Sequence, residues 1–259
     1  MNPTLLNDVC RLVKEAEELF FTGAGLEISN KGSRDYVTQV DLAASEYLVH
    51  HLPAILPGSR VFSEELAPSA PIDGGYCWVI DPVDGTTNLI YSVPLYTISI
   101  GLLYDYEPVL GVVYNPASGE MFCAAKGYGA FLNGKPIRVC DDERLEQTLV
   151  LVETNPYADR TKTRSYDVIG RVFLDCIDYR VIGSAALDIC YVASGRCGVF
   201  FAERLRTWDC VGGFAILQEA GGQYTNWQGE AFSFTNTHGE SLIASNRKLH
   251  DTALKYTKT

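Results

Sequence analysis

Apolar and polar residues in the first part of the chain recur with the spacing of helices. Apolar side chains return every three or four positions across residues 5–21, among them Leu5, Val9 and Leu12, and a second helical stretch covers residues 42–52. A period near 3.6 places such side chains on one face of a helix, where they can pack against a core. The pattern therefore predicts two helices before the first strand that carries candidate chemistry.

Short β runs broken by turns follow in the middle of the chain. We predict strands at residues 97–104, 109–114, 120–125, 130–131 and 136–139. The turn residues between them include Pro116, Gly119 and the pair Asn133-Gly134, which favours a tight hairpin. The pattern predicts a largely antiparallel meander, and it departs from the regular alternation of a doubly wound parallel fold.

The second half of the chain alternates helices with strands more evenly. We predict helices at residues 165–174, 185–193, 209–219 and 248–255, and strands at residues 179–182 and 198–201. No internal repeat, low-complexity tract or linker-like segment separates the two halves. We expect one compact unit with an N-terminal α+β half, residues 1–145, and a C-terminal α/β half, residues 146–259.

The run Asp81-Pro82-Val83-Asp84-Gly85-Thr86-Thr87-Asn88 joins two carboxylates, three positions apart, to a glycine turn and hydroxyl side chains. The preceding residues 76–80 are apolar and β-rich, so the acids lie where a buried strand reaches the surface. The residues after Gly85 can open a helix whose free N–H groups attract phosphate. Carboxylates beside an anion site favour magnesium. Taken alone, the run is also typical of an ordinary turn.

Two further acidic segments favour the interpretation of this motif as a metal site. Glu64 and Glu65 end a short predicted strand at residues 60–63, and Asp209 opens a helix of small residues after Trp208. A cluster of Glu64, Asp81, Asp84 and Asp209 without cations would lose stability through mutual repulsion, so its plausible joint purpose is to hold divalent metals. Individually, the paired glutamates could be a solvated turn and Asp209 a helix cap.

Four segments in this order resemble the inositol monophosphatase family of magnesium-dependent, lithium-sensitive phosphatases, which is related to fructose-1,6-bisphosphatase. They are residues 31–41, the pair Glu64-Glu65, residues 81–88, and Trp208-Asp209 followed by Gly212-Gly213. The haloacid dehalogenase phosphatases share an Asp-x-Asp-Gly-Thr signature, but theirs lies near the chain start and is one residue shorter. We therefore set that family aside.

The resemblance implies a fold, a metal set and a reaction. The fold is a layered α-β-α-β-α sandwich of the α+β class, with a largely antiparallel N-terminal sheet and a smaller mixed C-terminal sheet. Two or three magnesium ions would bind, and the implied ligands are Glu64, Asp81, the Val83 carbonyl, Asp84 and Asp209. The reaction would be hydrolysis of a phosphomonoester by metal-activated water.

The resemblance also implies catalytic and substrate-binding residues. Thr86 would orient the attacking water and Asp41 would accept from its hydroxyl, with Glu64 at the metal. Asp41 also suits the first turn of a helix, and both roles could hold at once. Lys31 is interpreted as a solvated lysine outside the site. The implied substrate contacts are Gly85, Thr86, Thr87, Glu153, Ser184, Ala185, Glu203, Arg206 and Asp209.

Substrate identity depends on the segment before Trp208. Many family members carry an acid six residues before this tryptophan, where this chain has Ala202, with Glu203 beside it. Inositol monophosphate is the first expectation. Arg204 and Arg206 could instead read a second anionic group, as in fructose 1,6-bisphosphate, NADP or 3′-phosphoadenosine 5′-phosphate, or they could be solvated arginines. A catalytically silent, metal-binding regulatory relative is the alternative of another class.

The charge and cysteine content of the chain limit the classes of partner and the location that we expect. A net charge of −11 argues against a nucleic-acid partner and against anionic membranes. No apolar run approaches the ~18 residues of a membrane span, and no leader opens the chain. The eight cysteines form no Cys-x-x-Cys pair, which predicts reduced thiols and a cytoplasmic protein. Because the family is often dimeric, we expect a homodimer that acts on a small phosphorylated metabolite.

Overall fold

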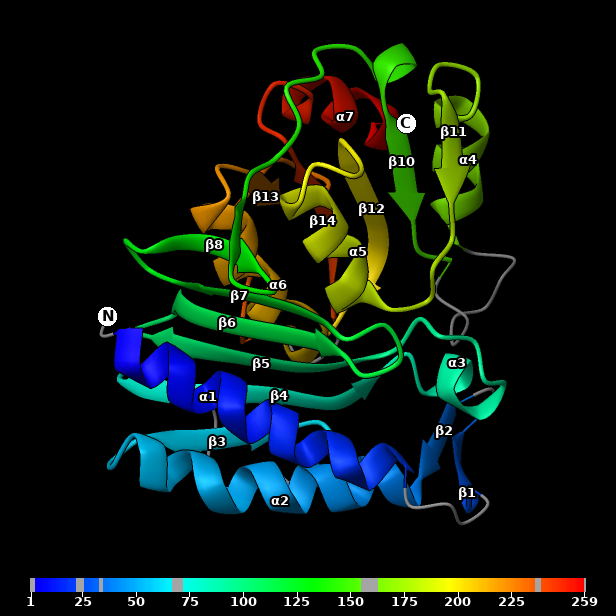
Figure 1. Cartoon of the computed structure of the whole chain (residues 1–259). Helices are drawn as coiled ribbons and strands as arrows, with labels where there is room; N and C mark the ends of the chain where they lie inside the picture. Colours follow the sequence, from blue (N-terminus) through cyan, green and yellow to red (C-terminus); the bar gives the residue numbers. More distant parts are fainter. Residues whose placement is uncertain are drawn as a thin grey trace.

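Two helices cover one face of the larger sheet in the computed structural model of the chain (Figure 1). The structure describes residues 3–21, 26–32, 35–66, 72–154, 163–235 and 239–258. Helices α1 (Pro3–Ala16) and α2 (Gln39–Ile55) bury Leu12, Val13 and Leu48 against Trp78 and Ile100 of the sheet. The first predicted helix is shorter than expected, because the chain tightens into the 3₁₀ helix η1 (Glu17–Phe21).

The larger sheet confirms the predicted meander. Its order is β3-β4-β5-β6-β7-β8-β9, and every neighbouring pair is antiparallel except β3 and β4. The tight turn at Asn133-Gly134 has the two positive φ angles, 48° and 75°, that this pair favours. The strands are β3 (Arg60–Ser63), β4 (Tyr76–Asp84), β5 (Thr97–Tyr104), β6 (Glu107–Asn115), β7 (Glu120–Ala125), β8 (Gly129–Leu132) and β9 (Lys135–Ile137).

The smaller sheet is mixed, as expected. Its order is β11-β10-β12-β14-β13, with β10 parallel to both of its neighbours and β14 antiparallel to both of its own. Only β11 and β12 were predicted from the sequence. The strands are β10 (Leu149–Val152), β11 (Asp178–Arg180), β12 (Val199–Leu205), β13 (Gln223–Thr225) and β14 (Glu240–Ser245).

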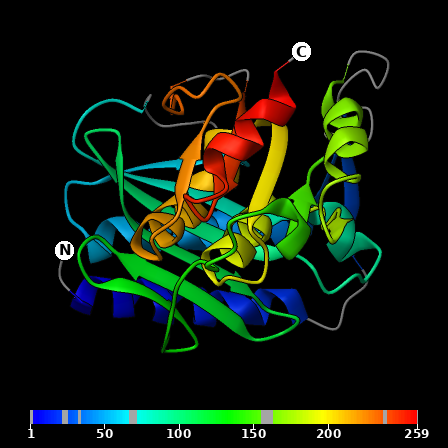
Figure 2. The same cartoon turned by 90° about the horizontal axis from the view of Figure 1, so that it is seen from above.

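The helices complete five layers and confirm the α-β-α-β-α arrangement. Helices α5 (Ala185–Ala193) and α6 (Thr207–Glu219) lie between the two sheets, in a core shared with Val113 and Phe200. Helices α4 (Ser165–Val172) and α7 (His250–Thr257) pack on the outer face of the smaller sheet, over Phe201 and Ile243, and Figure 2 shows them from above. Four short elements remain: β1 (Ile28–Gly32), β2 (Asp35–Thr38), α3 (Thr86–Ile90) and η2 (Leu145–Gln147).

Glycine contacts bring α6 directly against the larger sheet. A Cβ atom on Gly111 of β6 would lie 2.1 Å from the carbonyl oxygen of Gly212, and one on Gly212 would lie 2.8 Å from the hydroxyl of Ser99. Real side chains do not approach so closely, so only glycine allows this packing. The contact places the first turn of α6, with Asp209, beside the end of β4.

The division of the chain at residue 145 stays a prediction. The larger sheet is built from residues 60–137 and the smaller from residues 149–245. In the described segments, no helix combines the length and apolar character needed to cross a membrane.

Candidate active site

A pocket of about 540 Å³ lies at the end of β4, where the two halves of the chain meet. Small-molecule sites usually measure about 300–1,000 Å³. Its wall combines elements from both halves: β4 and α3 from the first, and the ends of β10 and β12 and the start of α6 from the second. The acids that line it are Asp35, Glu64, Asp81, Asp84, Glu153 and Asp209.

A bulge in β4 turns Asp81 and Asp84 toward the same pocket. Residues three apart in a regular strand point to opposite faces. Here Asp81 is opposite Ser99 and Asp84 is opposite Thr97, so three steps on β4 match two on β5. The extra residue brings both carboxylates to one side. The strand therefore continues through the motif, four residues beyond the end that the apolar run predicts.

Thr86 contacts Asp41, as the sequence led us to expect. The Thr86 hydroxyl lies 2.9 Å from Oδ1 of Asp41 and 3.0 Å from the carbonyl oxygen of Val83. Gly85 caps α3 with a φ of 92°, a left-handed conformation suited to glycine. This backbone turn directs the Thr86 side chain back toward the end of β4.

Asp41 also caps its own helix. Its Oδ2 accepts from the backbone N–H of Thr38 at 2.8 Å and from the Thr38 hydroxyl at 2.5 Å. Burial raises the pKa of Asp41, although the hydrogen bonds from Thr38 and Thr86 oppose that shift. The Asp41 carboxylate thus caps its helix and also accepts a hydrogen bond from Thr86. Its catalytic role stays a prediction.

Asp84 is held by the start of α5. It accepts hydrogen bonds from the Ser184 hydroxyl at 2.6 Å, from the N–H of Ala186 at 2.8 Å and from the N–H of Ala185 at 3.2 Å. Ala185 lines the pocket, while Ser184 is fully buried behind Asp84. Ser184 thus orients a carboxylate of the pocket, and its contact with a substrate stays a prediction.

Asp209 occupies the first turn of α6, where its Oδ2 accepts the Arg206 N–H at 2.6 Å. Burial, followed by the charges of Glu64 and Asp84, raises the pKa of Asp209 well above its usual range. Asp81 behaves in the same way, since burial and the charge of Glu64 raise its pKa. For Asp84, burial outweighs the hydrogen bonds and raises the pKa to about 6.

These carboxylates fit magnesium in chemistry and in charge. All are hard oxygen donors, and their raised pKa values show that positive charge would stabilise the ionised forms. Across the described ranges, no three His, Cys, Asp or Glu side chains are grouped as metal ligands usually are. The carboxylates are turned instead toward N–H, hydroxyl and ammonium donors, so a bound cation would have to draw them together.

Lys31, which the sequence leaves outside the site as a solvated lysine, is exposed and forms ion pairs with two glutamates at the end of β3. Its Nζ lies 3.3 Å from Glu64 Oε1 and pairs more closely with Glu65, whose side chain is only 4% exposed. The hairpin of β1 and β2 folds back toward the end of β3, and this long-range contact leaves no local sequence signal. Burial raises the pKa of Glu65 to about 7, although Lys31 opposes the shift.

Glu203 is bound to the start of α4 and is not among the described residues that line the pocket, so its contact with a substrate stays a prediction. Its carboxylate accepts from the N–H groups of Arg164, at 2.9 Å, and Ser165, at 3.2 Å, and so caps the start of α4. It also accepts from the hydroxyls of Thr163 and Ser165. These bonds lower the pKa of Glu203 despite its partial burial. Arg204 and Arg206 do line the pocket.

Glu153 lines the pocket, as the resemblance implies, but the isolation of its carboxyl group is a feature that the sequence does not show. Its Oε2 is buried and has no hydrogen-bond partner among the described residues. Behind it lies Asp188 of α5, which is fully buried and has neither carboxyl oxygen paired within the same described set. Burial and the charge of Asp84 raise the pKa of Glu153 to about 8. An acid directly after a buried strand was the available signal, the same one that marked Asp81.

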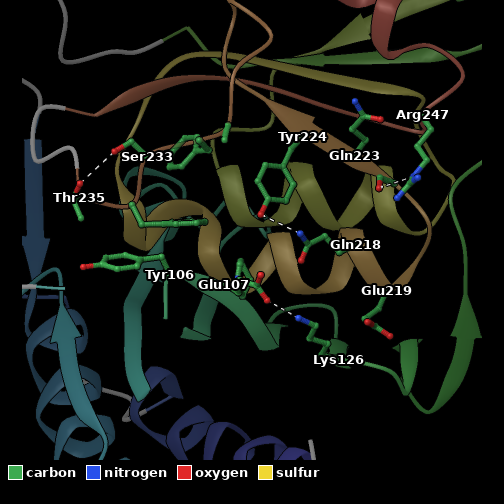
Figure 3. Close-up of a pocket in the computed structure, with 15 residues that line it drawn as sticks. Tyr106, Glu107, Lys126, Gln218, Glu219, Gln223, Tyr224, Ser233, Thr235 and Arg247 are labelled. Atoms are coloured by element: carbon green, nitrogen blue, oxygen red, sulfur yellow. Dashed lines mark hydrogen bonds and ion pairs between the residues drawn. The ribbon is translucent and has the colours of Figure 1, made fainter. Parts of the chain in front are cut away.

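A larger hollow, of about 1000 Å³, lies at the opposite end of α6 (Figure 3). It contains the ion pair of Lys126 with Glu107, at 2.5 Å, and a contact of 3.3 Å between the Gln218 amide and the Tyr224 hydroxyl. Its other charged side chains are bonded to the backbone, Glu219 to the N–H groups of Gly127 and Gly129 and Arg247 to the carbonyl of Gly222. Size therefore does not identify the site, whereas the buried acids of the smaller pocket do.

Comparison with known proteins decides the family. The family model described as "Inositol monophosphatase family" matches residues 4–259. The chain belongs to the inositol monophosphatase family. Inositol monophosphatase 2 of Solanum lycopersicum is 37% identical over 232 residues, covering 86% of each chain. Nus factor SuhB of Escherichia coli K12 is 36% identical over 233 residues, covering 88% of this chain and 87% of that protein.

A solved structure shows the same fold for this member of the inositol monophosphatase family. The extragenic suppressor protein suhB from Bartonella henselae superposes with a TM-score of 0.90, at 29% identity and over 99% of both chains. The chain is therefore similar both to a protein named as an inositol monophosphatase and to proteins named as a Nus factor and an extragenic suppressor. Family membership fixes the fold and the reaction class to test, and it leaves the substrate open.

Proposed function

We propose that the protein is a magnesium-dependent phosphomonoesterase that acts on a small phosphorylated metabolite. The observation that carries the proposal is the convergence, in one pocket, of carboxylates from β4, α6 and the end of β3 beside the Thr86 and Asp41 pair. Family membership supports the same reaction class. Two or three magnesium ions would be held by Glu64, Asp81, Asp84 and Asp209 and by the carbonyl oxygen of Val83.

Bound magnesium would supply a water of lowered pKa and positive charge to offset the phosphate. The side chains of the protein position this water. The Thr86 hydroxyl donates toward Asp41 or Val83, so its oxygen can accept a hydrogen bond from the attacking water. A proton that leaves this water can move through Thr86 to Asp41, which is buried and shielded from solvent. No nucleophilic side chain is required.

The alcohol and phosphate parts of the ester would contact opposite walls. The N–H groups of Gly85, Thr86 and Thr87 and the Arg206 guanidinium would hold phosphate oxygens. Ala185 and Asp209 line the same space. Inositol monophosphate is the first candidate substrate, and fructose 1,6-bisphosphate and the nucleotides NADP and 3′-phosphoadenosine 5′-phosphate are the alternatives.

Phosphate release tests the proposal. The panel is inositol 1-phosphate, fructose 1,6-bisphosphate, 3′-phosphoadenosine 5′-phosphate, NADP and histidinol phosphate, each with magnesium and with or without lithium. We expect turnover of one preferred ester, its inhibition by lithium, and its loss in Asp84→Asn. Glu230→Gln, at an exposed turn remote from the pocket, is the control. Absence of turnover on every ester, with magnesium bound, would reject the proposal.

A second candidate is a regulatory role, and the similarity to the Nus factor SuhB of Escherichia coli favours it. A silent relative would bind magnesium without turnover and act through partners. The same similarity removes support from the expectation that nucleic acid is not a partner. The retention of every proposed ligand, together with the Thr86 to Asp41 contact, favours the enzyme.

A homodimer and a cytoplasmic location stay predictions. Apolar side chains around α4 and β11 are exposed, among them Phe173, Leu174 and Ile177, with Leu174 78% exposed. Such a patch on a monomer is typical of an interaction surface, and a second copy is the occupant that the family resemblance suggests. Light scattering of wild type and Leu174→Asp would test it, with Ile28→Asp as the matched control on β1.

A further inference from the structure

Two cysteines that are far apart in the sequence lie together on the larger sheet. Cys10 belongs to α1 and Cys123 to β7, and α1 packs on both β6 and β7. The alternation along β7 turns Cys123 and Ala125 toward the core under α1, whereas Ala124 faces the core between the sheets. Cys10 packs against the same core as Cys123. Both thiols therefore lie in the layer between the helix and the sheet.

A polar contact between α1 and β6 accounts for the alignment of the two cysteines. Lys14 Nζ pairs with the Tyr114 hydroxyl, and Tyr114 lies opposite Met121 in the pairing of β6 with β7. Cys10 is about one helical turn from Lys14, roughly 6 Å along the axis, and Cys123 is two strand positions from Met121, roughly 7 Å. Similar steps from one contact thus lead to both cysteines, whose thiols are hydrogen-bonded to each other.

This hydrogen bond gives the two thiols different reactivity. It raises the pKa of Cys10, whose S–H is the donor, and it lowers the pKa of Cys123, where it outweighs burial. The thiolate is the form of cysteine that attacks a disulfide. Both side chains are partly exposed, so a small oxidant can reach them. Cys123 is therefore the attacking sulfur, and Cys10 is the thiol that resolves the intermediate.

The layer that carries these cysteines also packs behind the candidate active site. Helix α1 leads into η1, where the ring of Phe20 stacks on that of Tyr96 with 5.9 Å between their centroids. Tyr96 and Val83 belong to one small core cluster, and Val83 lines the pocket. A covalent bond between α1 and β7 would therefore stabilise the elements that pack behind the end of β4.

We propose that Cys10 and Cys123 are a redox-sensitive pair that closes to a disulfide and locks α1 onto the larger sheet. The oxidant is a small disulfide such as glutathione disulfide. The Cys123 thiolate attacks one of its sulfurs and releases one glutathione thiolate. Cys10 then loses its proton and attacks the sulfur of Cys123, which breaks the mixed disulfide and releases the second glutathione.

The exchange balances in electrons and protons. The protein loses two electrons, glutathione disulfide gains them, and the protons of the two cysteines end on the two glutathione thiols. Under reducing conditions the pair stays in the thiol form, in agreement with the reduced thiols that the sequence predicts.

Oxidation of the folded protein by glutathione disulfide tests the inference. We expect two of the eight thiols to be lost without added glutathione, and peptide mapping to find Cys10 linked to Cys123. Because the bond closes a long loop, the melting temperature should rise by about 5 °C or more, and dithiothreitol should reverse the rise. Hydrogen exchange of the α1 and η1 amides should slow, while that of α7 should not change.

Serine variants provide the controls. Cys10→Ser should keep a glutathione adduct on Cys123, because no second thiol displaces it, and its melting temperature should not rise. Cys176→Ser removes another partly exposed thiol, in the layer of α4 and α7, and should form the Cys10–Cys123 bond as wild type does.

Two results would overturn the inference. One is the absence of the Cys10–Cys123 linkage in wild type after oxidation. The other is a linkage that forms but leaves the melting temperature and the exchange of the α1 amides unchanged, because α1 is then not locked. None of these measurements depends on phosphate release, so they do not depend on the proposed phosphomonoesterase function.

Discussion

The Ser184 hydroxyl donates a 2.6 Å hydrogen bond to Asp84, which precedes it by 100 positions in the chain. The contact joins the start of α5 to the end of β4 and fixes one carboxylate oxygen. Ser184→Ala should lower the free energy of unfolding by about 1 to 2 kcal/mol, because a hydrogen bond to a charged group is lost in a buried place. Chemical denaturation at pH 8 measures this change.

The same substitution should weaken magnesium activation. With Ser184 gone, Asp84 keeps only two N–H donors and turns more freely, so the magnesium concentration for half-maximal phosphate release should rise several-fold. Ser194→Ala, at the other end of α5, removes a hydroxyl that only contacts the carbonyl of Tyr191. Equal effects of the two substitutions would contradict a specific role for Ser184.

Substitutions of Thr86 separate its hydroxyl group from its packing. Thr86→Ala should lower kcat about 10²-fold or more, because the water-positioning hydroxyl and its contact with Asp41 are both lost. Thr86→Ser keeps the hydroxyl and should keep most of kcat. Steady-state phosphate release on the preferred ester measures both. If serine and alanine variants were equally impaired, the methyl group rather than the hydroxyl would be the important part.

The stability of the metal-free protein should fall as pH rises. The pKa of Asp84 is raised to about 6 and that of Glu153 to about 8, in each case first by burial. Such a carboxyl group has a higher pKa in the folded protein than in the unfolded chain. At pH values between these two pKa values, the folded state therefore binds more protons than the unfolded state. Stability is therefore lost from about pH 4 to pH 8, at about 1.4 kcal/mol for each unit of pKa displacement.

Magnesium should reverse this trend. Cations bind the ionised carboxylates, so the gain in melting temperature on adding magnesium should grow with pH. Melting curves at pH 5, 6.5 and 8, with EDTA or with magnesium, measure both effects. Glu153→Gln should flatten the slope in EDTA. A melting temperature in EDTA that rises from pH 5 to pH 8 would show that these acids do not control stability.

Glycine packing gives a prediction for the helix between the sheets. Gly111→Ala should destabilise the fold by about 3 kcal/mol or more, since its Cβ would lie 2.1 Å from the Gly212 carbonyl oxygen and backbone cannot move aside cheaply. Gly170→Ala in α4 is the matched control, because no atom lies within 4 Å of its added Cβ and alanine favours a helix. We expect that variant to be neutral or slightly stabilised in the same unfolding assay.

Strands with clear alternation and turns were predicted closely. The bounds of β5, β7 and α5 agree with the sequence pattern, because each is a largely apolar run with turn residues or a polar step at its ends. The missed elements lack such signals. Strand β1 is exposed along its whole length, β13 has three residues, and β10 is a four-residue apolar run whose type depends on its neighbours.

The candidate site was predictable where its residues are close in the sequence. Asp81, Asp84 and Thr86 belong to one run, Glu64 and Asp209 stand out as acids at a strand end and a helix start, and the family resemblance added Asp41. Side chains whose contacts come from distant elements were not predictable. Glu203 reaches α4, Lys31 reaches Glu64 and Glu65, and the isolation of Glu153 depends on what surrounds it in three dimensions.

The direct contact of α6 with the larger sheet also restricts how the protein can move. Helix α6 carries Asp209 in its first turn, and Gly212 rests on β5 and β6 through backbone atoms. Side chains can change rotamer to absorb a sliding motion, but these backbone atoms cannot. Helix α6, and Asp209 with it, therefore cannot slide along the larger sheet, so adjustment to a bound ligand has to come from pocket side chains outside this contact.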